Sequence, residues 1–197
     1  MERTLAIHRG KQLQYATLLY NATEAAVSLS AGALASSVSL VSFGVDSLIE
    51  LLASLAALFL LHNKASEKTA QRLIACSFVL LALGTAFEAL TRVESAQRSK
   101  AGLIIAIASV VVMPLLSRQK KNVAAALNSS ALSSEARQTD FCFYLSVVLL
   151  VGVLAQWLFN AEWVDSAAAL AMTPLILLEA RRSWLGQSCA GGCECHL

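Results

Sequence analysis

The chain has 197 residues, of which 57% are hydrophobic and 14% are charged, and its mean hydropathy is +0.64. Soluble domains contain about 45–50% apolar residues, so this composition excludes an ordinary soluble protein and indicates an integral protein of the lipid bilayer. The formal net charge of +2 comes from scattered basic residues. Because they form no basic patch, we expect no nucleic-acid partner.

Six mostly apolar stretches are each long enough to cross a hydrocarbon core about 30 Å thick as a helix. We expect membrane helices at residues 13–35, 38–62, 72–92, 101–117, 138–160 and 163–182. The predicted fold class is therefore all-α, a polytopic six-helix transmembrane bundle. This bundle occupies residues 13–183, between an amino-terminal segment of residues 1–12 and a flexible tail of residues 184–197. The alanine-rich segment 118–137 is predicted to be a cytoplasmic helical extension of the fifth helix.

Lysine and arginine are distributed unevenly between the two ends of the predicted helices. Most of them fall in the amino terminus, the 63–71 loop, the 118–137 segment and the end of the sixth helix. The opposite side carries Arg92, Arg98 and Lys100. Because basic loops are retained in the cytoplasm, we expect both termini to be cytoplasmic. The expected location is a bacterial inner (plasma) membrane.

The second predicted helix carries two carboxylates within SFGVDSLIELLAS, residues 42–54. Asp46 and Glu50 are four residues apart, so they lie on one helix face, with Glu50 near the midpoint. A charged aspartate at that depth costs about 2.5–3.5 kcal/mol on insertion scales. The apolar parts of the other predicted helices offer no lysine or arginine at that depth. We therefore expect a cation or proton site, although two protonated acids that only hold the bundle together fit the same pattern.

Two further acidic residues are auxiliary candidates for a metal or proton pathway. Glu24 lies near the middle of the first predicted helix, where a polar pathway and a helix-packing hydrogen bond are equally good explanations. Asp165 lies near the outer end of the sixth predicted helix, where solvation at the membrane interface is the simpler explanation.

Three segments together have a characteristic layout. They are the pair Asp46-SLI-Glu50, the segment SSEARQTDFCFYLS at 133–146, and WVDSAAALA at 163–171, which opens the sixth helix with an acid. This layout resembles the cation diffusion facilitators, and the resemblance covers nearly the whole chain. It implies a transporter of zinc or related divalent metals, proton-coupled and homodimeric, with a tetrahedral site between the second and fifth helices. Only a short tail follows the sixth helix, so the chain resembles a membrane-domain-only member.

The resemblance also implies metal ligands on the fifth helix, where the family carries an acid, a histidine three residues later and an aspartate four residues after that. Placing the aspartate on Asp140 puts Ala136, which cannot ligate, at the histidine position. Placing the leading acid on Glu135 puts Gln138 at the histidine and Cys142 at the aspartate. We favour the second register, because these three residues form one helical stripe.

The implied metal ligands are Asp46, Glu50, Gln138, Asp140 and Cys142, with Glu135 as an auxiliary. Asp140 would then lie at the opening of the site or handle protons, and Cys142 could also be an ordinary buried cysteine. Two carboxylates and a thiolate suit Zn²⁺, Cd²⁺ or Co²⁺, because a soft thiolate disfavours magnesium and calcium.

We therefore expect a secondary transporter that exports divalent transition metals by proton antiport, works as a homodimer and carries no resident cofactor. We expect no enzyme, because the sequence shows no nucleophile and base pair and no phosphate-binding loop. The alternative is a non-transporting membrane protein that binds metal as a sensor or partner subunit.

The end of the chain, SCAGGCECHL, is rich in thiols. Its candidate metal ligands are Cys189, Cys193, Cys195 and His196. Cytoplasmic thiols are kept reduced, so metal binding is favoured over disulfides. An inert or lipidated tail is the alternative.

Overall fold

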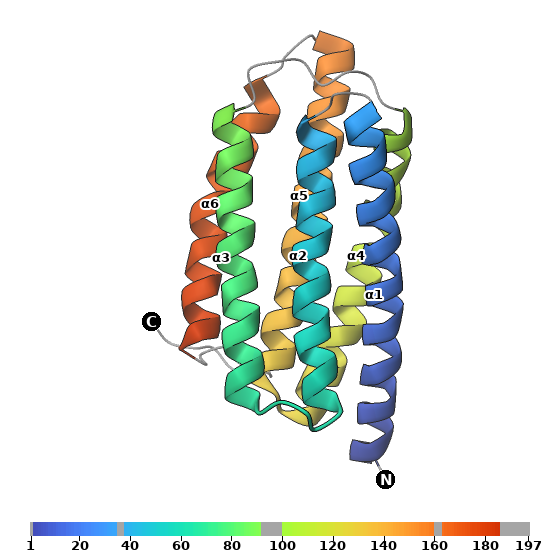
Figure 1. Cartoon of the computed structure of the whole chain (residues 1–197), viewed down its shortest axis with the longest axis vertical. Helices are drawn as coiled ribbons and strands as arrows, with labels where there is room; N and C mark the ends of the chain where they lie inside the picture. Colours follow the sequence, from blue (N-terminus) through green and yellow to red (C-terminus); the bar gives the residue numbers. More distant parts are fainter. Residues whose placement is uncertain (1, 35–37, 92–99, 160–162, 186–197) are drawn as a thin grey trace.

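The computed structural model describes residues 2–34, 38–91, 100–159 and 163–185, which are helical apart from short turns. The helices are α1 (Glu2–Leu34), α2 (Val38–Leu61), α3 (Glu67–Thr91), α4 (Lys100–Leu127), α5 (Ser130–Phe159) and α6 (Trp163–Trp184). They run side by side along one long axis (Figure 1). The predicted all-α fold class is confirmed for the described residues.

The packing of the helices places α5 at the centre of the bundle. Helix α1 packs against α2 and α4, and α3 packs against α2 and α6, whereas α5 contacts α2, α3, α4 and α6. The start of α1 and the end of α6 lie at the same end of the bundle, together with the turns between α2 and α3 and between α4 and α5 (Figure 1). We call this end the turn end. Its location in the cytoplasm stays a prediction.

Both turns at the turn end depend on an asparagine. Asn63 follows α2 with φ 56°, and Asn128 follows α4 with φ 50°. Asparagine tolerates this left-handed conformation better than most residues, and it commonly ends a helix this way. After α2, the Lys64 N–H donates to the carbonyl oxygen of Phe59 over 2.9 Å, which satisfies an acceptor at the helix end. The same pattern follows α4.

The segment 118–137 is divided between two helices. Residues 118–127 complete α4, and α5 begins only after Asn128 ends α4 and Ser129 caps the next helix with its hydroxyl. The prediction of one extension of the fifth helix is therefore wrong for residues 118–127. One consequence is that Lys120 lies on α4, on a helix that packs against both α1 and α5.

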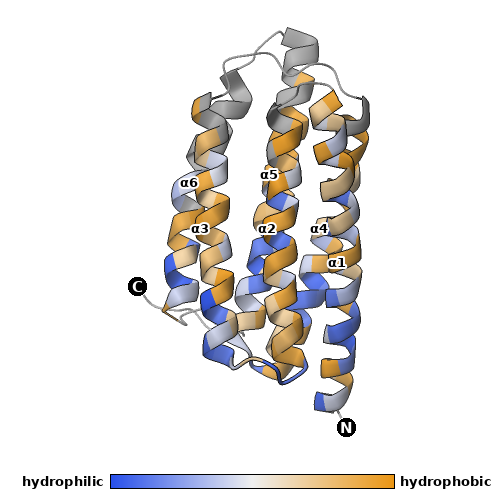
Figure 2. Cartoon of the chain, viewed as in Figure 1, coloured by the Kyte–Doolittle hydropathy of each residue, from blue (hydrophilic) through white to orange (hydrophobic). Residues whose placement is uncertain are grey.

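The bundle has a largely apolar exterior, and its interior contains both apolar and polar side chains. Large apolar side chains are exposed along the helices, among them Leu19, Leu83, Phe87, Ile104 and Val111. The interior contains an apolar cluster, mainly from α3 and α2, and many buried polar groups between α1, α2, α4 and α5. Figure 2 shows the hydrophobic colouring along the helices and the hydrophilic residues toward the turn end. An apolar exterior of this kind suits contact with lipid.

Three helices are long and apolar enough to cross a membrane by length and composition. The qualifying stretches are Phe43–Leu61, Glu67–Phe87 and Leu103–Leu127, in α2, α3 and α4. Within the described residues, α1, α5 and α6 do not qualify. Helices α1 and α5 bury polar side chains such as Glu24 and Glu135, and these lower their hydropathy. The structure therefore supports six helices with three clear candidate spans.

Helices α1 and α2 approach closely because glycines lie at their contact. A Cβ atom added at Gly44 would lie 2.7 Å from Leu29 Cγ, and one added at Gly32 would lie 2.8 Å from Val41 Cγ2. Real Cβ atoms do not come this close, so both positions need glycine for this helix spacing.

Candidate functional site

Asp46 and Glu50 both point into the bundle from α2, as their spacing predicts. The exposed fractions are 7% for Asp46 and 1% for Glu50. The same face of α2 continues with buried Ala53 and Ser54, small residues that leave room for neighbouring helices. Asp46 lies beside α3, where a Cβ atom added at Gly84 would be 3.7 Å from the Asp46 Oδ1 atom.

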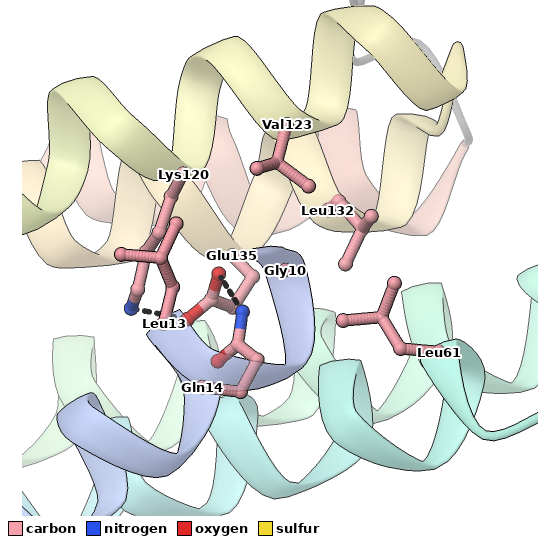
Figure 3. Close-up of a pocket in the computed structure, with 8 residues that line it drawn as sticks. All are labelled: Gly10, Leu13, Gln14, Leu61, Lys120, Val123, Leu132 and Glu135. Atoms are coloured by element: carbon pink, nitrogen blue, oxygen red, sulfur yellow. Dashed lines mark hydrogen bonds and ion pairs between the residues drawn. The ribbon is translucent and has the colours of Figure 1, made fainter. Parts of the chain in front are cut away.

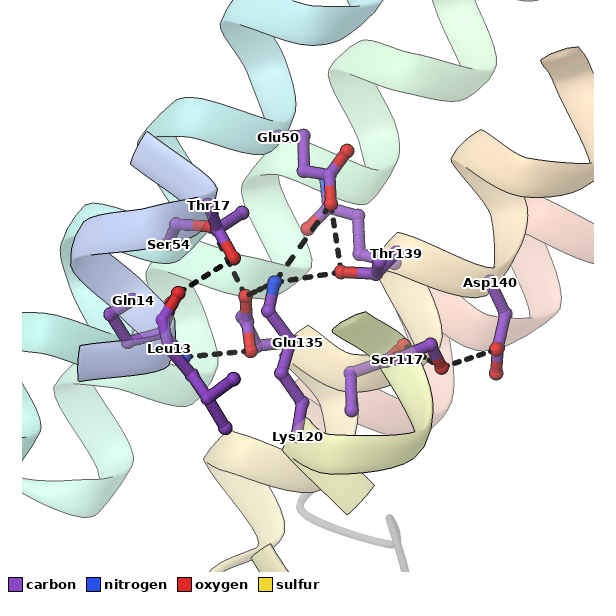
Figure 4. Close-up of polar contacts among 12 residues, drawn as sticks. Leu13, Gln14, Thr17, Glu50, Ser54, Ser117, Lys120, Glu135, Thr139 and Asp140 are labelled. Carbon is purple, nitrogen blue, oxygen red and sulfur yellow. Dashed lines mark hydrogen bonds and ion pairs between the residues drawn. The ribbon is translucent and has the colours of Figure 1, made fainter. Parts of the chain in front are cut away.

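A lysine from α4 reaches Glu50 and a third carboxylate, Glu135 of α5. Lys120 is 2% exposed, and it is the one buried lysine or arginine among the described side chains. Its Nζ atom lies 2.5 Å from Glu135 Oε1 and 3.9 Å from Glu50 Oε1, and it donates to Thr139 Oγ1 over 2.8 Å (Figure 4). The expectation that no basic residue lies at the depth of Glu50 is therefore wrong. The reason is that α4 continues to Leu127 and carries Lys120 along its inner face.

Glu135 is the principal partner of that lysine. Besides the Lys120 ammonium group, its carboxylate accepts hydrogen bonds from Gln14 Nε2 of α1 and Ser54 Oγ of α2, each over 3.1 Å (Figure 4). Buried carboxylates are costly unless they are paired and hydrogen-bonded. Glu135 meets both conditions, so it joins α1, α2, α4 and α5 at one point.

Glu50 is less completely satisfied than Glu135. Thr139 of α5 donates to its Oε1 atom over 2.7 Å, while its buried Oε2 atom has no hydrogen-bond partner among the described residues. One ammonium group therefore lies within ion-pair distance of two carboxyl groups, Glu50 and Glu135. A carboxylate oxygen left in this way is an acceptor for a cation, a water or a proton.

Cys142 lies beside Glu50, as the favoured register predicts. It is 6% exposed, and its thiol is close enough to the Glu50 carboxylate to interact with it. Within the described residues, however, no three side chains of histidine, cysteine, aspartate or glutamate are grouped closely enough to hold a metal ion as they stand.

Gln138 is buried next to α3 instead of next to Glu50. Its Oε1 atom accepts a hydrogen bond from Ser77 Oγ over 2.9 Å, and its Nε2 atom has no partner among the described residues. Its exposed fraction is 0%, so the predicted inward stripe on α5 is present. The residue of α5 that actually contacts Glu50 is Thr139.

Asp140 lies on another side of α5. Its carboxylate pairs with Lys121 Nζ over 2.6 Å and accepts from Ser117 Oγ over 2.5 Å, and its side chain is 27% exposed. Figure 4 shows it apart from the Lys120 cluster. The structure therefore does not bring Asp140 to Glu50, and its role as a ligand stays a prediction.

Glu24 joins three helices at a second polar point. Its carboxylate accepts hydrogen bonds from Ser47 Oγ of α2 over 2.9 Å, from Tyr20 OH over 3.3 Å, and from Ser109 Oγ of α4. These contacts match the helix-packing explanation for Glu24. Its place in an ion pathway stays a prediction.

A small pocket near the turn end leads to the Lys120–Glu135 pair. It is lined by Gly10, Leu13, Gln14, Leu61, Lys120, Val123, Leu132 and Glu135 (Figure 3). It has room for about one water molecule. Gly10 matters for this shape, since a Cβ atom added there would lie 3.0 Å from Val123 Cγ1.

Several predicted site residues cannot be placed. Cys189, Cys193, Cys195 and His196 lie outside the described residues. Asp165 belongs to α6, but its side chain lies outside the described side chains.

Sequence reasoning missed Lys120 and Thr139. A signal for Lys120 existed, because Ser109, Met113, Ser117 and Lys120 recur at spacings of three and four residues and are all buried. That pattern marks one inner face of α4. Because Lys120 is basic, the distribution of basic residues predicts a cytoplasmic segment at this position instead of a buried face.

The comparisons with known proteins agree with this architecture. The family described as "Cation efflux transmembrane domain" matches residues 15–184, from within α1 to the end of α6. A comparison with curated proteins found no match to this chain. The family match includes α2 with Asp46 and Glu50 and α5 with Cys142. The chain therefore belongs to the cation efflux family, the cation diffusion facilitators, which are membrane-embedded cation transporters.

Proposed function

We propose that this protein exports divalent transition-metal ions, with Zn²⁺, Cd²⁺ or Co²⁺ as cargo, through a site between α2 and α5. One observation carries the proposal. The buried Glu50 carboxylate keeps an oxygen without a hydrogen-bond partner among the described residues, and the Cys142 thiol lies beside it. A carboxylate next to a thiol is a donor set for these metals.

The proposed ligands are Glu50, Cys142 and Asp46. Asp46 is one helical turn from Glu50, about 6 Å along the axis at 1.5 Å per residue, so it must turn toward the ion to complete the site. A water would supply a fourth position, or the Gln138 amide oxygen would do so after turning away from Ser77 of α3. Cys142 favours zinc, cadmium and cobalt over magnesium and calcium, because thiolates are soft ligands.

We further propose that protons drive the export and that the protein works as a homodimer. Protons and metal ions compete for the same carboxylates and thiol, because these ligands must be deprotonated to bind a metal. One site can therefore couple an outward metal flux to an inward proton flux. Vesicles with an imposed pH gradient test this coupling, since a metal flux that ignores the gradient would contradict it.

The proposed function is tested by transport in proteoliposomes that contain the purified full chain. A metal-sensitive dye inside the vesicles reports Zn²⁺ or Cd²⁺ entry. Glu50→Gln and Asp46→Asn should abolish the flux, and Cys142→Ser should reduce it. The matched control is Cys76→Ser, which changes an exposed thiol on α3 and should leave the flux unchanged.

Wild-type flux in both carboxylate variants would overturn the proposal. Asp140→Asn adds a comparison between the two predicted registers: the structure favours retained transport, because Asp140 contacts Lys121 and Ser117 instead of Glu50. Metal binding by the wild-type chain with no flux at all would favour the sensor alternative.

A further inference from the structure

We infer that Lys120 is a tethered competitor of the cargo: its ammonium group lies beside Glu50 when no metal ion is bound, and a metal ion on Glu50 displaces it from Glu50 while it stays paired with Glu135. This inference rests on the proposed function, because it assumes that Glu50 binds the cargo. It adds a residue of α4 that sets how tightly the site holds its ion.

The position of the ammonium group supports this role. Lys120 Nζ is 3.9 Å from Glu50 Oε1 and 2.5 Å from Glu135 Oε1, so it stands between the two carboxylates and already favours the second. Thr139 links the two sides, because its hydroxyl accepts from Lys120 and donates to Glu50. A small displacement of Nζ therefore breaks its interaction with Glu50 and keeps its ion pair with Glu135.

Glu135 holds the Lys120 ammonium group in place through their ion pair. Gln14 and Ser54 donate to its two oxygens in addition to Lys120, so both of its oxygens already have donors within the protein. Glu135 therefore serves as the anchor of Lys120 and not as the leading metal ligand that the sequence pattern implied. Of the two carboxylates, Glu50 is the one with an oxygen available to bind cargo, because its Oε2 atom has no hydrogen-bond partner among the described residues.

Electrostatic repulsion explains why a bound metal ion would move the Lys120 ammonium group away from Glu50. Two unit charges about 4 Å apart interact strongly in a buried site, where water screens them poorly. A divalent ion on Glu50 therefore repels the Lys120 ammonium group. The small pocket lined by Lys120, Gln14 and Glu135 lies on the turn-end side (Figure 3), and it gives the displaced group room to stay hydrated. A site with its own cation binds cargo more weakly and releases it more easily.

A different result is expected if the Lys120 ion pair only joins α4 to α2 and α5. If Lys120 has that role alone, removing it disturbs the site and leaves metal affinity unchanged or lower. If Lys120 competes with cargo, removing it raises metal affinity. The sign of the change in Kd therefore separates the two roles.

The test is calorimetric titration of Cd²⁺ into the full chain in lipid nanodiscs at a fixed, mildly alkaline pH. Every variant also carries Cys189→Ser, Cys193→Ser and Cys195→Ser, so that the tail thiols do not bind the added metal. Lys120→Met should lower the Kd for Cd²⁺ by about tenfold or more, since a buried competing charge is removed. Lys121→Met is the matched control: its side chain is 49% exposed and pairs with Asp140, so the Kd should not change. An unchanged or raised Kd in Lys120→Met, with an intact fold by thermal melting, would overturn the inference.

A second variant covers the case in which Lys120→Met does not fold. Lys120→Met combined with Glu135→Gln removes both charges of the closer ion pair and keeps their shapes, so Glu135 is not left as a buried charge without its partner. This double variant should also bind Cd²⁺ more tightly than the wild type, and equal or weaker binding would overturn the inference. If Glu50→Gln still binds Cd²⁺ normally, the proposed function itself fails. If Glu50→Gln abolishes binding while neither lysine variant tightens it, the inference alone fails.

Discussion

Lys120 Nζ of α4 lies 3.9 Å from Glu50 Oε1 of α2, and both side chains are 1% exposed. Thr139 of α5 is hydrogen-bonded to both residues. Three helices therefore meet at one buried charge cluster near the middle of the bundle. Any ion that binds Glu50 changes the forces on α4 and α5 as well as on α2, which is how a binding event can bias the packing of helices.

The first prediction concerns stability. Lys120→Ala leaves Glu50 and Glu135 without their shared cation, and breaking a buried pair costs about 3–5 kcal/mol. Lys121→Ala removes a half-exposed pair with Asp140, which is worth about 0–1 kcal/mol. Thermal melting of the purified variants in detergent checks this. Equal melting temperatures for the two alanine variants would show that the buried Lys120 ion pair contributes no more to stability than the more exposed Lys121 pair.

The second prediction concerns the contact between α1 and α2. Gly44→Ala places a Cβ atom 2.7 Å from Leu29 Cγ, so the helices must separate, at a cost of about 1–3 kcal/mol for overpacking. Gly84→Ala is the matched control, because its nearest atom would be Asp46 Oδ1 at an ordinary 3.7 Å. Only the first variant should melt at a lower temperature, and equal stability of the two would contradict the close packing.

The third prediction concerns metal preference. Cys142→Ser replaces a soft sulfur ligand with a hard oxygen, so the affinity for Cd²⁺ should fall more than the affinity for Zn²⁺. The wild-type chain loaded with Co²⁺ should show a thiolate-to-cobalt charge-transfer absorption band that this variant lacks. Persistence of the band in Cys142→Ser would show that another thiol binds the metal.

Much of the architecture follows from the sequence. The spacing of Asp46 and Glu50 predicted that both face inward, and the structure buries both. Glu135, Gln138 and Cys142 are also all buried on α5, as one stripe requires. These predictions succeed because helical periodicity fixes which side chains share a face before any packing is known.

The partners of those residues did not follow from the sequence. A lysine near a helix end ordinarily marks a cytoplasmic segment, but Lys120 is carried inward because Asn128 ends α4 later than predicted. Likewise Gln138 meets Ser77 of α3, and Thr139 meets Glu50. Which of two adjacent residues on one buried face meets a given partner depends on the rotation of the helix in the bundle, and periodicity alone cannot set it.

Anomalous scattering from crystals of the full chain loaded with Cd²⁺ tests the central claim most directly. The account predicts a peak between α2 and α5 that is coordinated by Glu50 and Cys142, with Lys120 Nζ moved away from Glu50 and still paired with Glu135. A peak at Asp140 or elsewhere in the chain, with Lys120 still between Glu50 and Glu135, would contradict it.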